Sequence, residues 1–446
     1  MNIFWSSWLT IAAIFFFPLF FMSVRHGVHI FLFLLLFIAL FQFYKRNHHF
    51  LNLQTSESRL IIAIFSAPIL AVFISQLFRG AMYLPAFDGP ARILAAGVIC
   101  LYLRRLDIPY LKILELAIPL SLIATFVSFR IYPEASSLLW GGRYATYFVD
   151  PNSLGSQSLI LGLMSLMLIR PLGYEPPYLL ILKLAGFSIG LYLTIGSGSR
   201  GGWMTTPFIF LLMILVRVGD INRSAVSDKS KMWAQTVWIF LVILFFTLIL
   251  FYFSEKLSLR INSAYFEIRN WLTGENLDSS AGTRLSIWRF SFQFASESLL
   301  FGYGEEKNMM QFLSKSPLNI PANEIAINTM ALTGPHSDIL SKLLSSGLFG
   351  LIAYLCLLFI PFYFFYIHRN SPIADKKQAA RIGMYYITGV FIAGLSNEQL
   401  SLKYLCTFYG LMTATLLAQV LQASKQVADQ HLAPSGTKAH EASVNG

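Results

Sequence analysis

Long apolar segments recur along almost the whole chain, and they constrain its fold more than any other feature. The stretch GPHSDILSKLLSSGLFGLIAYLCLLFIPFYFF, residues 334 to 365, is one of them. A helix needs about twenty mostly apolar residues to cross the hydrocarbon core of a bilayer. Strands of a membrane barrel would instead alternate between apolar and polar residues. The segments do not alternate, so the sequence predicts an all-α polytopic membrane protein.

The composition excludes a soluble protein. Hydrophobic residues make up 56% of the 446 residues and charged residues 12%, and the mean hydropathy is +0.61. The first residues have no basic region and no cleavage site typical of a signal peptide, so they are expected to form a retained first helix. In all, we expect about twelve transmembrane helices, centred near residues 15, 35, 68, 97, 121, 161, 188, 209, 243, 354, 389 and 412.

Lysine and arginine residues gather in alternate connections between the predicted spans. With the first residues in the cytoplasm, the inside connections include Lys45, Arg104, Arg217 and Arg369, as the positive-inside rule expects. The net charge of +11 therefore reflects topology, and no nucleic acid partner is expected. The predicted organisation is nine membrane helices in residues 1–253, a large loop on the outer side of the membrane in 254–335, three membrane helices in 336–422 and a disordered cytoplasmic tail in 423–446.

The unusual residues of the chain fall in the outside connections. The segment 254–335, roughly eighty residues long, is the largest of these. Its aromatic and aliphatic content predicts two or three amphipathic helices near the membrane surface. Cys100, Cys356 and Cys406 lie within apolar segments, so we expect them to be packing residues, with no metal site and no cofactor.

The turn GSGSRGGW, residues 196 to 203, links two predicted spans. It matches G-x-G-x-x-G literally, but a membrane helix precedes it in place of the strand that a dinucleotide site requires. The remaining interpretation is a tight turn that places Arg200 and backbone N–H groups at the outer end of a helix pair, where a phosphate could bind. The alternative is an arginine that reaches the lipid headgroups.

A second arginine occurs in AGTRLSIWRFSFQF, residues 281 to 294. Arg284 and Trp288 are four residues apart and share a helix face, while Arg289 points elsewhere. A guanidinium offers a rigid fork of donors that matches diphosphate oxygens, and a solvated surface arginine is the alternative. Arg143 is a weaker candidate for diphosphate binding, because the Asp150-Pro151-Asn152 run that follows it is typical of a structural helix start.

His336 is the candidate general base. Proline is favoured in the first turn of a helix, so Pro335 is predicted to start a helix with His336 in its first turn. The helix dipole there favours a neutral imidazole, which can accept a proton. A polar helix cap is the alternative. The sequence spacing does not decide whether Asp338 orients the ring.

The motifs FVDPNSLG, SGSRGGW, TRLSIW followed by FGYG, and PHSDILSKLLSSGLFGL resemble, in this order, the O-antigen ligase family of bacterial inner-membrane proteins. Its superfamily includes O-antigen polymerases and protein O-oligosaccharyltransferases. The resemblance implies a metal-independent, inverting glycosyltransferase of the GT-C type in lipopolysaccharide biosynthesis. Such an enzyme transfers a glycan from undecaprenyl diphosphate to a sugar hydroxyl of lipid A-core at the periplasmic face of a Gram-negative inner membrane.

The resemblance also implies roles for individual residues. Arg200 and Arg284 would bind the diphosphate and stabilise it as a leaving group, and His336 would assist the acceptor hydroxyl. The residues agree with this chemistry, because the outside connections offer no convincing Asp-x-Asp pair for a metal and fixed cations must then stabilise the leaving group.

Three alternatives remain. An O-antigen polymerase uses the same donor but a lipid-linked glycan as acceptor, and a protein O-oligosaccharyltransferase uses a protein. A secondary transporter or flippase would place ionisable residues in the middle of broken membrane helices. The predicted spans are nearly free of charge, and the polar candidates gather on one side of the membrane, which favours an enzyme that works at the surface of the bilayer.

Overall fold

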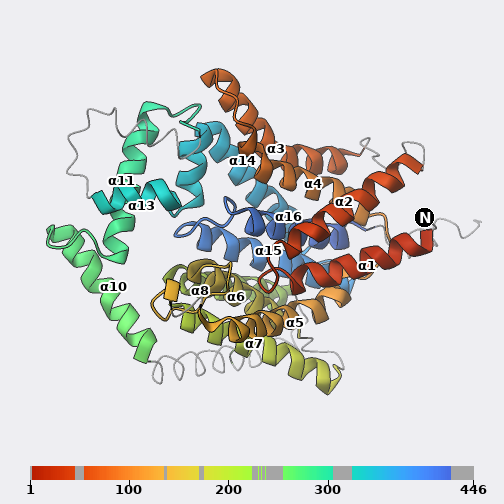
Figure 1. The fold of residues 1–446 in the computed structure, drawn as a ribbon. Helices are drawn as coiled ribbons and strands as arrows, with labels where there is room; N and C mark the ends of the chain where they lie inside the picture. Colours follow the sequence, from red (N-terminus) through yellow and green to blue (C-terminus); the bar gives the residue numbers. More distant parts are fainter. Residues whose placement is uncertain are drawn as a thin grey trace, which may run out of the picture.

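The computed structural model describes residues 3–45, 55–134, 138–169, 175–223, 255–304 and 324–422, together with residues 230, 233 and 237. These parts of the chain are helices and connecting turns, without a strand (Figure 1). The predicted all-α fold is therefore confirmed for the described residues. The span predicted near residue 243 and the tail predicted at 423–446 lie outside them.

The elements follow one another along the chain, and the predicted centres that fall in the described residues all lie within a helix. They are α1 (Ile3–Leu19), α2 (Gly27–Lys45), α3 (Ser56–Arg79), η1 (Leu84–Phe87), α4 (Asp88–Leu103), α5 (Tyr110–Ile131), α6 (Pro151–Met167), α7 (Pro177–Ser197), α8 (Arg200–Arg223), α10 (Glu255–Thr273), α11 (Ser280–Glu297), α13 (Glu324–Thr333), α14 (Asp338–His368), α15 (Ala374–Gly394) and α16 (Lys403–Leu421).

Among the described residues, eight helical segments are long and apolar enough to cross a membrane, which confirms a multi-pass membrane protein. They are Gly27–Lys45, Ser56–Arg79, Leu84–Leu103, Tyr110–Ile131, Pro177–Ser197, Arg200–Asn222, Asp338–His368 and Lys403–Leu421. Three other predicted centres lie in α1, α6 and α15. The helices α1 and α6 have 17 residues each, fewer than the about twenty that a span needs, and α15 begins with several charged residues. Twelve spans therefore remain a prediction.

Close approach of small residues holds the bundle together. The helices α6 and α7 pack through Gly162 and Gly190, and a Cβ atom on Gly190 would lie 2.6 Å from the carbonyl oxygen of Ser158. Small residues allow such close packing of helix backbones where no water drives association. The helix α16 lies at the centre of the bundle, with the side chains from Leu405 to Val420 all buried.

A smaller group of helices, α10, α11 and α13, lies to one side of the bundle (Figure 1). All three belong to the segment predicted as a large loop, where amphipathic helices were expected. An apolar core joins Ile287 and Phe290 of α11 to Met330 of α13 and Leu344 of α14. This core fixes α11 against the first half of α14.

The motif FGYG, residues 301 to 304, docks on a kink in α14. At Gly347 the backbone is non-helical, with φ of 63° and ψ of −154°. The amides of Tyr303 and Gly304 donate hydrogen bonds to the carbonyl oxygens of Leu344 and Ser345, at 2.7 and 3.0 Å. The FGYG motif thus contacts the end of the PHSDILSKLLSSGLFGL motif. This contact ties the end of α11 to α14.

Candidate functional site

Three arginines line one small pocket of about 20 Å³. Arg143 comes from the segment before α6, Arg200 begins α8, and Arg284 lies near the start of α11. Three motifs that are far apart in the sequence therefore meet at one place. Asn152 and Asn397 add amide groups to the same wall.

The turn between α7 and α8 explains why Arg200 lies there. Gly198 ends α7 in the left-handed region, with φ of 62°. The hydroxyl of Ser199 then accepts a hydrogen bond from the amide of Gly202 and so caps α8. A Cβ atom on Gly201 would lie 2.0 Å from the hydroxyl of Ser396. The tight turn predicted from GSGSRGG is therefore present, and its glycines allow the start of α8 to approach the loop after α15.

The guanidinium of Arg200 is held by a residue that the sequence did not single out. Its Nη1 and Nη2 atoms donate to Oε2 and Oε1 of Glu267 at 2.9 and 2.8 Å, and Nη2 also donates to the hydroxyl of Ser263 at 2.7 Å. These hydrogen bonds from Arg200 hold the pKa of the Glu267 carboxyl below its usual value. An acidic residue on the polar face of an amphipathic helix is usually solvated, so its position gave no sign of this pairing.

Arg143 has a structural role. Its Nε atom donates to the carbonyl oxygen of Ser197 at 2.8 Å, and its Nη2 atom donates to Oδ1 of Asn152 at 2.7 Å. The carboxylate of Asp150 accepts from the amides of Asn152 and Ser153 and caps α6. The structural interpretation of the Asp-Pro-Asn run is thus supported, and Arg143 joins this helix start to the end of α7.

Arg284 differs from the other two arginines. No side chain of the described residues forms a hydrogen bond or an ion pair with its guanidinium. Burial lowers its pKa, the charge of Arg200 lowers it further, and Glu267 and Asp150 oppose the shift. An arginine still remains protonated at neutral pH. The exposed Arg289, five residues later, points away as expected.

His336 is partly buried close to Arg284. Burial lowers the pKa of its imidazole to about 4, with a further contribution from the positive charge of Arg284 and an opposing one from Asp150. Its Nε2 atom lies 3.1 Å from the hydroxyl of Thr333. The ring is therefore neutral at pH 7, as the sequence suggested.

The predicted helix start at Pro335 is wrong, however. Ser337 is the N-cap and Asp338 the first residue of α14, so His336 precedes the helix and has a left-handed backbone with φ of 50°. The neutral ring follows from burial and from Arg284, where the sequence had suggested the helix dipole.

Asp338 does not orient the histidine. Its fully buried carboxylate accepts hydrogen bonds from the amides of Gln399 and Leu400, at 2.9 Å and between 2.9 and 3.1 Å. Asp338 therefore orders the loop between α15 and α16. Because Ser396 and Asn397 of that loop line the arginine pocket, the carboxylate supports the pocket wall indirectly.

A much larger cavity of about 400 Å³ lies among α3, α4, α14 and α16. Its apolar wall includes Val72, Ile93 and Leu357. Two of its cationic residues are Arg79 and Lys342. Pro335 also lines it, so the cavity extends to the residue next to His336. The sequence gave no sign of this cavity.

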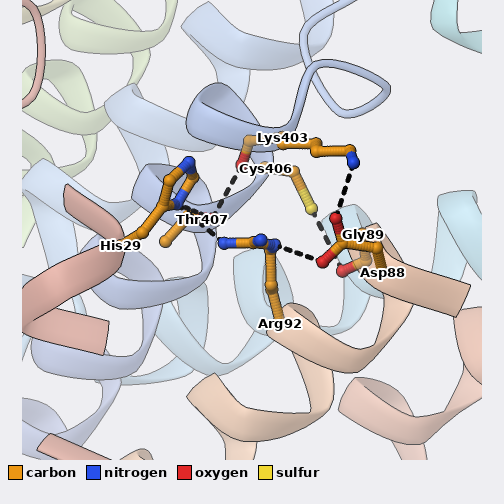
Figure 2. A network of polar contacts seen from close by, with 7 residues as sticks. All are labelled: His29, Asp88, Gly89, Arg92, Lys403, Cys406 and Thr407. Atoms are coloured by element: carbon orange, nitrogen blue, oxygen red, sulfur yellow. Dashed lines mark hydrogen bonds and ion pairs between the residues drawn. The ribbon is translucent and has the colours of Figure 1, made fainter. Parts of the chain in front are cut away.

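A polar network that includes Lys403, a residue of the cavity lining, lies next to this cavity. Figure 2 shows the network. Asp88 accepts from Arg92 at 2.8 Å and from Lys403 at 2.7 Å. Arg92 also donates to Nδ1 of His29 at 2.8 Å, and the same nitrogen lies 3.1 Å from the hydroxyl of Thr407. The network joins α2, α4 and α16 at their first turns. Only the spacing of Asp88 and Arg92, which suits a helical ion pair, could have suggested it.

The chain resembles known proteins over the region that contains these residues. Residues 185–355 match a family model described as O-antigen ligase, and this range includes Arg200, Arg284 and His336. An uncharacterised protein of Haemophilus influenzae is 22% identical in an alignment of 270 residues that covers 53% of this chain and 64% of that protein. The match thus spans less than two thirds of the relative's length. In the described residues no three His, Cys, Asp or Glu side chains form a cluster that could hold a metal ion.

Proposed function

We propose, from the match of residues 185–355 to the O-antigen ligase family model, that this membrane protein is an inverting glycosyltransferase of the GT-C type. It transfers a glycan from undecaprenyl diphosphate to a sugar hydroxyl of lipid A-core, without a metal ion or other cofactor. The reaction takes place at the periplasmic face of a bacterial inner membrane. The distribution of basic residues, with the candidate site on the side opposite to most of them, supports this orientation.

One observation supports the proposal most strongly. Arg284 has no hydrogen-bonded or ionic side-chain partner among the described residues, and it lies in the same pocket as Arg200. Its charge also acts on a neutral His336. Departure of a sugar from a diphosphate builds negative charge on the phosphate oxygens. Fixed guanidinium groups in a partly buried site stabilise such charge strongly, because little water screens them.

The reaction needs a base as well as a cation. The acceptor hydroxyl attacks the anomeric carbon from the face opposite the diphosphate, the new C–O bond forms, and the bond to the diphosphate oxygen breaks with inversion. His336 is neutral at pH 7 and can accept the hydroxyl proton. The leaving diphosphate keeps the electron pair of the broken bond, and Arg200 and Arg284 stabilise it. Arg143 supports the same site by holding the turn that carries Arg200.

The large cavity suits the amphiphilic acceptor. Its wall is apolar between α3, α4 and α14, while Arg79 and Lys342 offer positive charge to an anionic glycolipid. The Nζ atom of Lys342 donates to the hydroxyl of Ser401 at 3.1 Å and keeps further donors for a ligand. Because Pro335 lines the cavity, an acceptor held there would present its sugar near His336.

A ligase and an O-antigen polymerase differ in the molecule that receives the glycan, so the identity of the product distinguishes them. Purified protein should be reconstituted with a glycan on undecaprenyl diphosphate and with lipid A-core, with EDTA present, and the products separated by gel and mass spectrometry. The proposal expects glycan-bearing lipid A-core. Longer undecaprenyl-linked chains alone would indicate a polymerase, and a glycan on protein a protein oligosaccharyltransferase. Ion-driven uptake of substrate into sealed vesicles, without any product, would indicate a transporter.

A further inference from the structure

The carboxylate of Glu267 makes the contacts expected of a bound phosphate. Both its oxygens accept from the guanidinium fork of Arg200, at 2.8 and 2.9 Å. Its Oε2 atom also accepts from the amide of Ala281 at 2.8 Å, in the first turn of α11. An arginine fork combined with a free amide at a helix N-terminus is a typical binding arrangement for phosphate oxygens.

The positive charge around this position exceeds that of one carboxylate. Arg284 lies close enough for its charge to interact with both Glu267 and Arg200. Arg143, Arg200 and Arg284 line one pocket near the positive end of α11, whereas two carboxylates, those of Glu267 and Asp150, act on Arg284 with the opposite charge. A phosphate group with more than one negative charge would balance the three arginines better.

The arginine pocket is also too small for a diphosphate as it stands. Its volume of about 20 Å³ is close to the about 10–15 Å³ that a single water molecule requires. Because both oxygens of Glu267 already accept from the guanidinium of Arg200, a phosphate group can pair with that guanidinium in the same way only after Glu267 has moved. The carboxylate of Glu267 is negatively charged, as a phosphate group is. It already accepts hydrogen bonds from Arg200 and from the amide of Ala281.

The helix that carries Glu267 packs against only a few of the other described helices. Of the described elements, α10 packs mainly against α11, with a smaller contact to α7. Large apolar side chains on its other face are exposed, such as Tyr265 at 65% and Leu272 at 72%. Among the described residues, withdrawal of α10 would break its packing on α11 and α7, the hydrogen bond from Trp271 to Ser286 and the bonds of Arg200 to Glu267 and Ser263. In Figure 1 this helix lies at the edge of the molecule.

We infer that the position filled by the Glu267 carboxylate is a phosphate subsite formed by Arg200, Arg284 and the amide of Ala281. In the structure Glu267 occupies this subsite as an internal ligand, and a phosphate group must displace it. The inference rests on the proposed function only in that the phosphate is assigned to the lipid diphosphate donor.

Binding of inorganic pyrophosphate to the purified full chain tests the subsite without any transfer. Isothermal titration should compare wild type with Glu267→Gln, and with Glu275→Gln as a matched control on an exposed residue near the end of α10. If the form with Glu267 bound to Arg200 is about tenfold more populated than the form with Glu267 displaced, the Glu267→Gln variant should bind pyrophosphate about tenfold more tightly. The control should bind like wild type, and Arg200→Ala should abolish the gain in the Glu267→Gln background.

Equal or weaker binding by Glu267→Gln, at an unchanged melting temperature, would overturn the inference, because the carboxylate would then only orient Arg200. If Glu267→Gln lowered the melting temperature, Glu267→Ala would be titrated below its own melting transition, with the same tenfold expectation. Transfer kinetics separate the two proposals. Tighter pyrophosphate binding without transfer to any acceptor would keep the subsite and reject the proposed function. A lower KM for the donor with unchanged kcat in Glu267→Gln would support both.

Discussion

The indole N–H of Trp288 donates a hydrogen bond of 3.1 Å to the carbonyl oxygen of Pro335, the residue before His336. Trp288 and Arg284 are four residues apart on α11 and share a face. One helix therefore holds the cation of the candidate site and also the segment that carries the candidate base. The strained left-handed backbone of His336 needs such support from its surroundings.

Trp288→Phe should slow the reaction without unfolding the protein. The phenyl ring keeps most of the packing but loses one hydrogen bond, worth about 1 kcal/mol, or roughly a fivefold lower kcat if that bond positions His336. Steady-state transfer kinetics would measure it. Trp8→Phe, at an exposed position on α1, is the control and should leave kcat unchanged. An unaltered kcat in Trp288→Phe would mean that this hydrogen bond does not position the base.

The activity should depend on pH through His336 with a low apparent pKa. Burial and then Arg284 lower the pKa of His336 to about 4, so the ring stays neutral as the pH falls from 8 to about 5. The rate should be constant over that range and fall only near pH 4, where the ring gains a proton and can no longer act as a base.

Replacing Arg284 by glutamine should raise that pKa toward its usual value of 6.5, by less than the full shift because burial is the larger cause. NMR titration of labelled histidine in detergent would follow the change even where transfer is lost. A wild-type acid limb near pH 6.5 would contradict the low pKa of His336.

Gly347→Ala should destabilise the protein strongly. The position has a positive φ, and a Cβ atom there would lie 2.2 Å from the carbonyl oxygen of Leu300. Backbone strain alone costs roughly 1–3 kcal/mol, and the clash adds to it. Thermal unfolding in detergent should show a clearly lower midpoint. Gly141 has a similar positive φ, but a Cβ atom there would meet no atom within 4 Å. Gly219 has neither a positive φ nor such a close contact, so Gly141→Ala and Gly219→Ala serve as comparisons.

The three variants separate the two causes. The unfolding midpoint should fall most for Gly347→Ala, less for Gly141→Ala and hardly at all for Gly219→Ala. Equal midpoints for the first two would show that the contact between FGYG and the kink in α14 does not contribute to stability.

The sequence predicted the helical fold and singled out as candidates the three arginines that line the pocket, because both follow from local patterns. Apolar segments of about twenty residues predict helices wherever they occur. Arg200 lies in a glycine-rich turn and Arg284 on a patterned helix face, and the structure brings both to the same pocket as Arg143. The neutral state of His336 was also expected, although its cause differs.

Pairings between distant segments could not be predicted in the same way. Glu267 is 67 residues from Arg200, and no periodicity in either helix indicates that they meet. The contact between His29 and Arg92 likewise depends on how α2 packs on α4. The sequence placed the start of α14 too early because Pro335 fits a helix start locally. In the structure α14 begins at Asp338, whose carboxylate accepts hydrogen bonds from amides of the loop after α15.

The most direct test of the proposed chemistry compares two arginines on one helix. Transfer of glycan from undecaprenyl diphosphate to lipid A-core should be measured for wild type, Arg284→Ala and Arg289→Ala, each with a confirmed melting temperature. Loss of a positioned donor to a developing negative charge costs about 100-fold or more in rate. We therefore expect a drop of that size for Arg284→Ala and a nearly normal rate for Arg289→Ala, whose side chain is exposed on another face of α11. Near-normal transfer by Arg284→Ala would contradict the assignment of this pocket as the site that stabilises the leaving group.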